Sequence, residues 1–110
     1  MEERLYLTAL YDFYGPLLTG RQRGAFASYH INDLSLSEIA EQTGSTRQAV
    51  SDLIKRTEGI LRDYEDKLTL YAKYQQKSQQ AAAILKKIEK AAVFPKQNMA
   101  ELTRLINELL

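Results

Sequence analysis

The stretch SLSEIAEQTGSTRQAVSDLIKR, residues 35–56, decides the fold of this 110-residue chain. It opens with Ser35-Leu36-Ser37-Glu38, where a serine precedes a glutamate by three positions, the pattern of a capping box that starts a helix. Gly44 follows within about two turns and suits the left-handed conformation that ends a helix. A second helix, capped by Thr46 or Ser45, is expected to follow at once. Two helices joined by so short a turn predict a helix-turn-helix.

The apolar residues of this stretch fall where two crossed helices need them. A small side chain is required at the crossing, a residue tolerant of positive φ in the turn, and branched side chains pointing inward from both helices. Thr43 and Ser45 stand where many such motifs bury aliphatic side chains, and a buried hydroxyl costs about 1–3 kcal/mol unless it is hydrogen-bonded. We expect both to serve instead as caps. The inward set is Ile39, Ala40, Gly44, Val50 and Leu53.

The outward face of the second helix is polar, and its side chains suit DNA. Arginine can read guanine and glutamine can read adenine, each through two hydrogen bonds. Lys55 and Arg56 could also hold phosphates, whereas Asp52 would repel them unless it orients an arginine or accepts from cytosine. The alternative is a solvated face without a ligand. The face consists of Arg47, Gln48, Ser51, Asp52 and Lys55.

The rest of the chain also shows helical spacing and no strand alternation. An apolar stripe over residues 5–17 predicts a first helix. Thr19–Gln22 forms another capping box, after which Phe26 and Tyr29 face inward, with Ile31 near the helix end. The members of the first stripe are Leu5, Ala9, Leu10, Phe13, Tyr14 and Leu17.

After the motif, the reading helix is expected to run on toward Tyr71. The sequence then becomes rich in alanine, glutamine and lysine, which favours a helix that Pro95 ends. A last helix has one apolar face. We therefore predict a helix-turn-helix domain over residues 1–71 and a C-terminal helical extension over residues 72–110. The apolar face of the last helix comprises Leu102, Leu105, Ile106 and Leu109.

Composition limits the classes of function. Net charge is only +1, and it is uneven: residues 1–34 sum to −1, residues 35–70 to −2 and residues 71–110 to +4. Any DNA contact therefore comes from a few placed cations, because no broad basic field surrounds the motif. No apolar run is long enough to cross a bilayer and the acidic N-terminus does not read as a secretory signal, so we expect no membrane insertion and a cytoplasmic location.

Catalysis is not expected. The chain has no cysteine, no glycine loop for phosphate and no metal-ligand spacing, so neither a cofactor nor a metal is predicted. His30 is the one histidine and is interpreted as a surface or capping residue. The acidic cluster at residues 63–66 is interleaved with cations at i,i+4 spacing, as in Glu58–Arg62 and Asp63–Lys67, which is typical of a solvated helix face.

A protein-interaction module is the rival interpretation. Ile54, Leu61 and Leu68 recur every seven residues, beside Tyr64 and Tyr71, which indicates a seam against another helix. The seam can equally serve the chain's own core. A third interpretation combines both functions. In it, the long helix and the apolar face of the last helix form a homodimer, which presents two reading helices to a palindromic site. Seven tyrosines leave RNA open as a ligand, although their helical spacing fits core packing better.

Two families share these motifs. The stretch LLTGRQRGAFASYHINDLSLSEIAEQTGSTRQAVSDLIKRTEGIL resembles region 4 of bacterial sigma-70 factors. More closely, DFYGPLLTGRQ, LSLSEIAEQTG, STRQAVSDLIKRTEGIL and DYEDKLTLY resemble the YlxM family of small helix-turn-helix proteins. The likeness covers about residues 4–74; Ser45 departs from the valine usual before the reading helix.

The resemblance implies an all-α, sigma-region-4-like fold. It also implies a link to the signal recognition particle, because YlxM genes typically stand beside genes for its components. By analogy with sigma region 4, Arg21 and Arg23 would touch backbone phosphate while Arg47, Gln48, Ser51 and Lys55 face the bases. The sequence thus predicts a DNA-binding regulatory protein that binds duplex DNA; the alternative is a protein-interaction or RNA-associated helical module.

Overall fold

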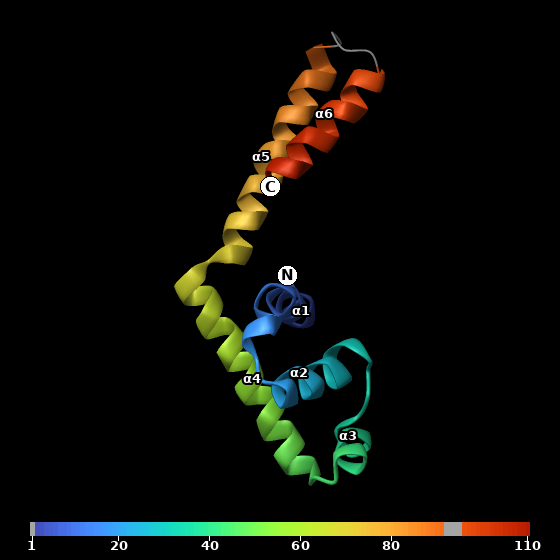
Figure 1. Cartoon of the computed structure of the whole chain (residues 1–110), viewed down its shortest axis with the longest axis vertical. Coiled ribbons are helices and arrows are strands. Elements are labelled where there is room, and N and C mark those ends of the chain that lie inside the picture. The colour runs from blue at the N-terminus through green and yellow to red at the C-terminus, as the bar shows by residue number, and fades with distance from the viewer. Residues whose placement is uncertain (1, 92–95) are drawn as a thin grey trace. The chain divides into compact units, whose positions relative to one another are not determined.

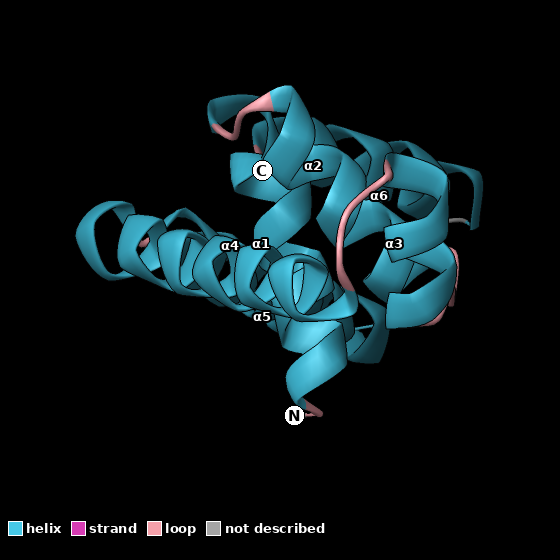
Figure 2. Ribbon diagram, turned by 90° about the horizontal axis from the view of Figure 1, so that it is seen from below, coloured by secondary structure: helices cyan, strands magenta, loops and turns pink. Residues whose placement is uncertain are grey.

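The computed structural model describes residues 2–91 and 96–110, and over these residues it contains six α-helices and no strand (Figures 1 and 2). A 3-10 turn, Gly15–Leu17, follows the first helix, and a π-helical turn, Ala27–Ile31, follows the second. The predicted all-α fold is confirmed. Pro95, which was predicted to end the helix before the last one, lies outside the described residues. The helices are α1 (Glu3–Tyr14), α2 (Gly20–Phe26), α3 (Leu36–Thr43), α4 (Arg47–Leu68), α5 (Leu70–Ala91) and α6 (Lys96–Leu109).

The chain forms two compact units, Met1–Tyr71 and Ala72–Leu110. The first unit contains α1 to α4 and the first residues of α5. The second consists of the rest of α5 together with α6. No helix of the described residues combines the length and the apolarity that a membrane crossing would require.

One core of the first unit lies where α1 and α2 pack on the C-terminal half of α4. Its centre is almost free of solvent contact, and burying each large side chain contributes about 1.5–3 kcal/mol. The predicted stripe of α1 was partly wrong: Leu5 is 62% and Leu17 is 55% exposed, whereas Leu7 is buried. Apolar residues surround much of α1, so spacing alone did not select the buried side. The buried cluster is Leu7, Leu10, Tyr14, Leu18, Phe26 and Leu61.

A second core joins α2, α3 and the N-terminal half of α4. Ala25 on α2 contacts a cluster built from both helices of the predicted motif. Leu53, predicted to point inward, packs against this cluster as a half-buried residue. The buried members are Ala25, Ile39, Ala40, Val50 and Ile54.

The π-helical turn after α2 changes which residues face inward. Phe26 is fully buried, as predicted, and its ring stacks on Tyr11 with 4.8 Å between ring centroids. Tyr29, however, is 38% exposed, so its predicted inward orientation was wrong, and Ile31 at the end of the turn is 47% exposed. A π-helix takes more residues per turn than an α-helix, which rotates the following side chains away from the expected face.

The long helix breaks earlier than predicted. α4 ends at Leu68, and Thr69 adopts φ 52°, ψ 28°, a left-handed conformation that is rare for a β-branched residue. A new helix then starts at Leu70. The predicted continuation toward Tyr71 as one helix was therefore wrong.

A buried hydrogen-bond network holds this break. The Tyr14 hydroxyl donates to Glu65 Oε1 at 2.5 Å and accepts from the Leu70 backbone N–H at 3.1 Å. Glu65 Oε1 also accepts from the Tyr71 N–H at 3.1 Å. The network therefore satisfies N–H groups at the start of α5 that have no partner within that helix. Burial, aided by the hydrogen bond to Glu65, raises the pKa of Tyr14 above its ordinary 10.0.

Candidate nucleic-acid interface

The turn between α3 and α4 has the conformation that the sequence predicts. Gly44 adopts φ 67° and ψ 25°, the left-handed region that an alanine would enter only with strain. Its N–H and that of Ser45 both donate to the Ala40 carbonyl, the latter at 3.0 Å. The predicted helix-turn-helix is confirmed.

Both helices of the motif are capped by side chains. The Ser35 hydroxyl accepts from the Glu38 N–H at 3.1 Å, and the Glu38 carboxylate accepts from the Ser35 N–H at 3.0 Å. Hydrogen bonding from the Ser35 backbone N–H, followed by that of its hydroxyl, lowers the pKa of Glu38 below its ordinary value. Of the two caps considered for α4, Thr46 is used: its Oγ1 accepts from the Ala49 N–H at 3.1 Å.

The two hydroxyls beside Gly44 carry no burial penalty. Thr43 is exposed, and its hydroxyl donates to the Ile39 carbonyl at 2.8 Å. The half-buried Ser45 hydroxyl lies 3.0 Å from that of Thr43. Hydroxyls can therefore replace the usual aliphatic residues at this turn because they bond to each other and to the end of α3. Neither residue caps the N-terminus of α4.

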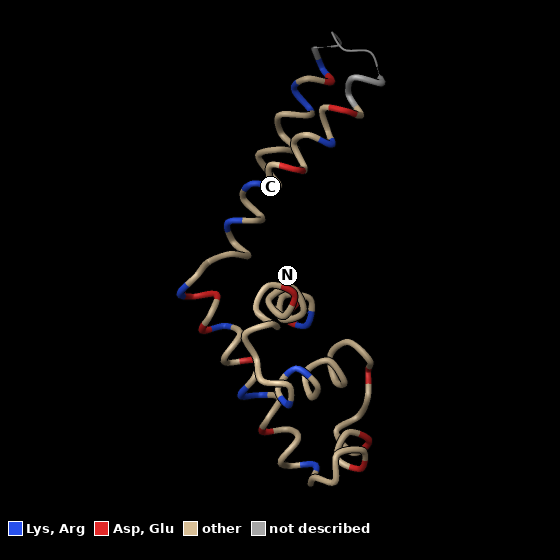
Figure 3. The backbone as a smooth tube through the Cα atoms, in the orientation of Figure 1, with Lys and Arg blue, Asp and Glu red and all other residues tan. Residues whose placement is uncertain are grey.

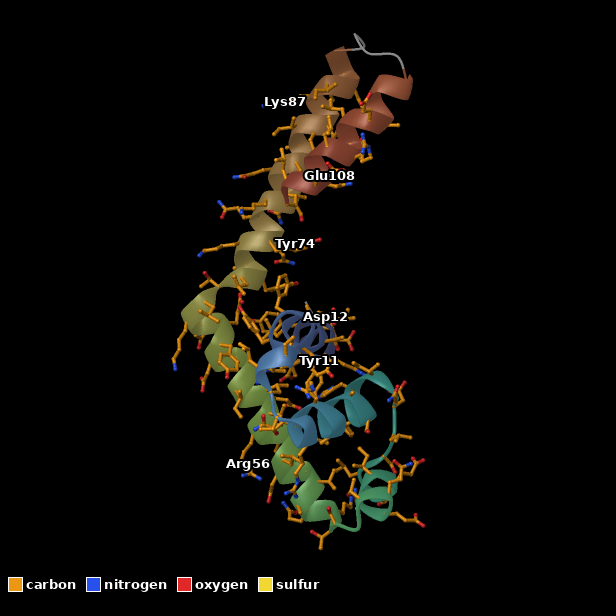
Figure 4. The ribbon with its side chains drawn as sticks, in the orientation of Figure 1. Tyr11, Asp12, Arg56, Tyr74, Lys87 and Glu108 are labelled. Atoms are coloured by element: carbon orange, nitrogen blue, oxygen red, sulfur yellow. The ribbon has the colours of Figure 1, made fainter. Side chains whose placement is uncertain are left out.

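The face of α4 opposite the core is polar and accessible. Four of the five predicted side chains are exposed, and Ser51 is half-buried. Arg56, on the flank of this face, extends into solvent (Figure 4). The exposed set is Arg47, Gln48, Asp52 and Lys55.

Asp52 interacts with a glutamine rather than with an arginine. Gln48 Nε2 donates to Asp52 Oδ1 at 2.9 Å, one turn further along α4. This bond uses one hydrogen of the amide group and leaves its second N–H and its carbonyl oxygen available. Those two groups are the pair that recognises adenine in the major groove. Asp52 thus restricts the orientation of Gln48.

The start of α2 contributes two further exposed cations. The predicted capping box is present, with Thr19 N–H donating to Gln22 Oε1 at 2.9 Å and Gln22 N–H donating to Thr19 Oγ1 at 3.2 Å. Arg23 makes a hydrogen bond within its own unit: its Nη1 donates to the Leu18 carbonyl at 2.7 Å. Arg21 lines a cavity of about 310 Å³ between α2, α3 and α4.

Sequence reasoning missed the polar contacts that fasten α1 and the π-helical turn. His30 was interpreted as a surface or capping residue, but its ring is only 9% exposed and Nε2 lies 2.9 Å from Glu58 Oε2. Arg4 donates to the His30 carbonyl and pairs with Asp33. These partners lie 26 to 29 positions apart, so no local pattern could reveal them.

Of the i,i+4 pairs predicted on α4, Glu58–Arg62 is replaced by pairs between elements. Glu58 faces His30, and Arg62 pairs with Glu3 of α1 at 2.6 Å.

Within the described part of the chain, no group of three or more His, Asp or Glu side chains could hold a metal ion.

The predicted heptad seam belongs mainly to the chain's own core. Ile54 is buried in the second core and Leu61 in the first. Tyr64 and Tyr71 pack against the first core, whereas Leu68 is 44% exposed. The intrachain interpretation therefore accounts for this periodicity, and the seam gives no support to a partner protein.

Comparison with known proteins places these features in one family. The family model described as "Putative helix-turn-helix protein, YlxM / p13 like" matches residues 1–105. A UPF0122 protein of Bacillus thuringiensis (strain Al Hakam) is 41% identical over 109 residues, which are 99% of this chain and 98% of the relative. A UPF0122 protein of Limosilactobacillus reuteri (strain DSM 20016) is 44% identical, over 99% of this chain and 93% of the relative.

A shorter match is more similar still. A UPF0122 protein of Geobacillus sp. (strain WCH70) is 48% identical over 79 residues, 72% of each chain. The match of the family model over nearly the whole chain and the coverage of the relatives lead to the same assignment. The chain belongs to the UPF0122 family of YlxM / p13-like helix-turn-helix proteins.

Proposed function

We propose that this protein is a DNA-binding regulator in which α4 is the reading helix. The supporting observation is the division of the first turns of α4 into two sides. Val50 and Ile54 fix one side in the core, while the opposite side presents Arg47, Gln48 and Lys55 to solvent. In a helix-turn-helix this outward side enters the major groove, with the N-terminal residues of the helix nearest the base edges.

The proposed base contacts follow from side-chain chemistry. Arg47 offers paired donors to guanine, and Gln48, held by Asp52, offers a donor and an acceptor to adenine. Ser51 and Lys55 complete the base-facing set. Each well-formed bidentate contact contributes about 1–3 kcal/mol of discrimination against the wrong base.

The proposed phosphate contacts are Arg21, Arg23 and Arg56. All three are exposed, and they come from α2 and α4. Arg23 keeps donors beyond the one that it gives to Leu18, so the same guanidinium could bridge the protein and a phosphate. Such contacts fix the register of the reading helix without reading sequence.

The proposal includes a homodimer that binds two half-sites. In the second unit Ile84 is 50%, Leu105 is 45% and Leu109 is 83% exposed. Two helices alone seldom bury enough apolar surface to be stable, so a second copy that covers these residues would complete a bundle. A two-fold dimer would place two reading helices on a palindromic site. Mass measurement by light scattering of the wild type and of Leu105→Glu tests this part.

The proposal extends to a place in the signal recognition particle pathway and a cytoplasmic location, which the resemblance to the YlxM family implies. On this view the bound genes would include those of the particle. Transcription of these genes would then change when the protein is removed.

Genome-wide crosslinking and immunoprecipitation tests the proposal. The wild type should enrich discrete sites, and Arg47→Ala combined with Gln48→Ala should abolish that enrichment. The matched control is Asp66→Ala with Lys67→Ala, two exposed residues on the same helix, which should leave the sites unchanged.

Two results would overturn the proposal. Sites that persist in the Arg47/Gln48 variant would exclude readout by α4. An absence of enriched sites, together with capture of RNA or of a protein by the wild type, would favour the interaction module instead.

A further inference from the structure

The two units differ in charge in a way that helix-turn-helix recognition alone does not explain. Residues 1–71 contain eight Lys and Arg against eleven Asp and Glu, a net charge of −3. Residues 72–110 contain seven against three, a net charge of +4. Because DNA affinity comes largely from cations that replace the counterions of phosphate, the unit that holds the motif lacks the charge that such proteins use. Figure 3 traces the basic residues along α5.

Four of the five lysines of α5 lie on one side of the helix, and Lys86 lies outside this group. At 100° per residue, Lys73, Lys77, Lys87 and Lys90 fall within about 140° of arc, together with Gln76 and Gln80. We call these four lysines the lysine face. The most buried residue of this part of α5, Ala81, and the half-buried Leu85 lie on the other side.

The lysine face is available to a ligand. All four lysines are exposed, and none of the ion pairs that the structure describes involves them. Figure 4 shows Lys87 extending from the side of α5 that faces away from α6. By contrast, Arg104 on α6 is near Glu101 and Glu108, at 3.9 and 3.4 Å. Four exposed lysines that share one helix face and make none of the described ion pairs are suited to bind an extended polyanion.

We propose that the lysine face binds the phosphate backbone of duplex DNA and provides the sequence-independent part of the affinity. From Lys73 to Lys90 the face extends over about 26 Å along the helix axis. A straight row of this length can contact several phosphates, because duplex DNA carries one charge per about 1.7 Å of its axis. The choice of duplex DNA rests on the proposed function of the helix-turn-helix; the anion-binding face itself does not.

The test is the salt dependence of binding by the full-length protein. The ligands are a fluorescent 30-base-pair duplex of unrelated sequence and one that contains an enriched genomic site. The slope of log K against log salt is negative, and each phosphate contact adds about 0.9 to its magnitude. Replacing the four lysines by glutamine should reduce that magnitude by about 2 to 4 on both duplexes and weaken binding at least about tenfold at low salt.

Two control variants separate this effect from unfolding and from readout by α4. The four lysines changed to arginine keep the charge and should keep the wild-type slope. Arg47→Ala with Gln48→Ala should lose discrimination between the two duplexes while retaining most of the slope on the unrelated one. Far-ultraviolet circular dichroism should show the same helix content in every variant.

Three results would overturn the inference. An unchanged slope in the glutamine variant would mean that these lysines do not contact DNA, and would leave the proposal for α4 intact. An effect of the glutamine variant on a 30-nucleotide RNA but not on the duplexes would assign the face to RNA. An effect only on vesicles containing phosphatidylserine would assign it to a lipid surface.

Discussion

The two units of the chain differ in both packing and charge. Of the buried residues in the described part of the chain, all but Ala81 belong to Met1–Tyr71. The first unit is acidic overall and holds α4 with two cores and a buried hydrogen-bond network, whereas the second is basic and keeps large apolar side chains exposed. Under the proposed function, this difference separates the geometry of DNA readout from the electrostatic affinity along the sequence, whereas many DNA-binding domains combine the two.

The largest contrast should appear when equivalent leucines are shortened in the two units. Leu61 is fully buried, so Leu61→Ala should lower the free energy of unfolding by about 2–5 kcal/mol. Leu105 is 45% exposed, and Leu105→Ala should cost less than about 1 kcal/mol in the monomer. Urea unfolding followed by far-ultraviolet circular dichroism measures both costs, because both units are helical. Equal costs would contradict the distinction between the units.

The next effect concerns the helix break at the end of the first unit. Tyr14→Phe removes the donor to Glu65 and the acceptor of the Leu70 N–H. Leaving buried polar groups without partners should lower the free energy of unfolding by about 1–3 kcal/mol. The matched control, Tyr29→Phe, changes an exposed tyrosine and should stay within about 0.5 kcal/mol of the wild type in the same assay. If both variants behave alike, the network does not stabilise the break.

Two glycines of the first unit should respond with opposite signs to the same substitution. Gly44→Ala forces an alanine into φ 67° and should destabilise by about 1 kcal/mol or more. Gly59 lies in the middle of α4 with no atom within 4 Å of an added Cβ, so Gly59→Ala should stabilise by about 0.5–1 kcal/mol. Thermal unfolding compares them, and a loss of stability in both would show that α4 is packed differently.

The smallest effect concerns the exposed cap of α3. Hydrogen bonds from Ser35 lower the pKa of Glu38 below its ordinary 4.5, so its contribution to stability is present above pH 4.5 and is lost as the pH falls through the lowered pKa. Glu38→Gln keeps an acceptor for the capping box but does not titrate. The melting temperature of the wild type should exceed that of the variant at pH 7, and this advantage should diminish as the pH is lowered below 4.5. A pH-independent difference would exclude this cause.

Features that depend on nearby residues could be predicted from the sequence. Both capping boxes, the left-handed Gly44 and the inward set of the motif follow from neighbouring positions. Each is encoded within about one or two helical turns, so spacing is sufficient. The exposed side of α4 followed from the same register.

Features that depend on distant partners could not be predicted. The pairing of His30 with Glu58 joins elements 28 positions apart, and the break at Thr69 depends on Tyr14 of α1. The π-helical turn likewise leaves Tyr29 exposed, against the expected period. In each case tertiary packing outweighed local preference.

The central claim is that the outward side of α4 enters the groove of duplex DNA. The most direct measurement is a titration of isotope-labelled protein with an enriched duplex, followed by backbone amide chemical shifts. We predict the largest shifts at Thr46 to Arg56, with smaller ones near Arg21 and the lysine face. Shifts that omit the start of α4 while the duplex is bound would contradict the account.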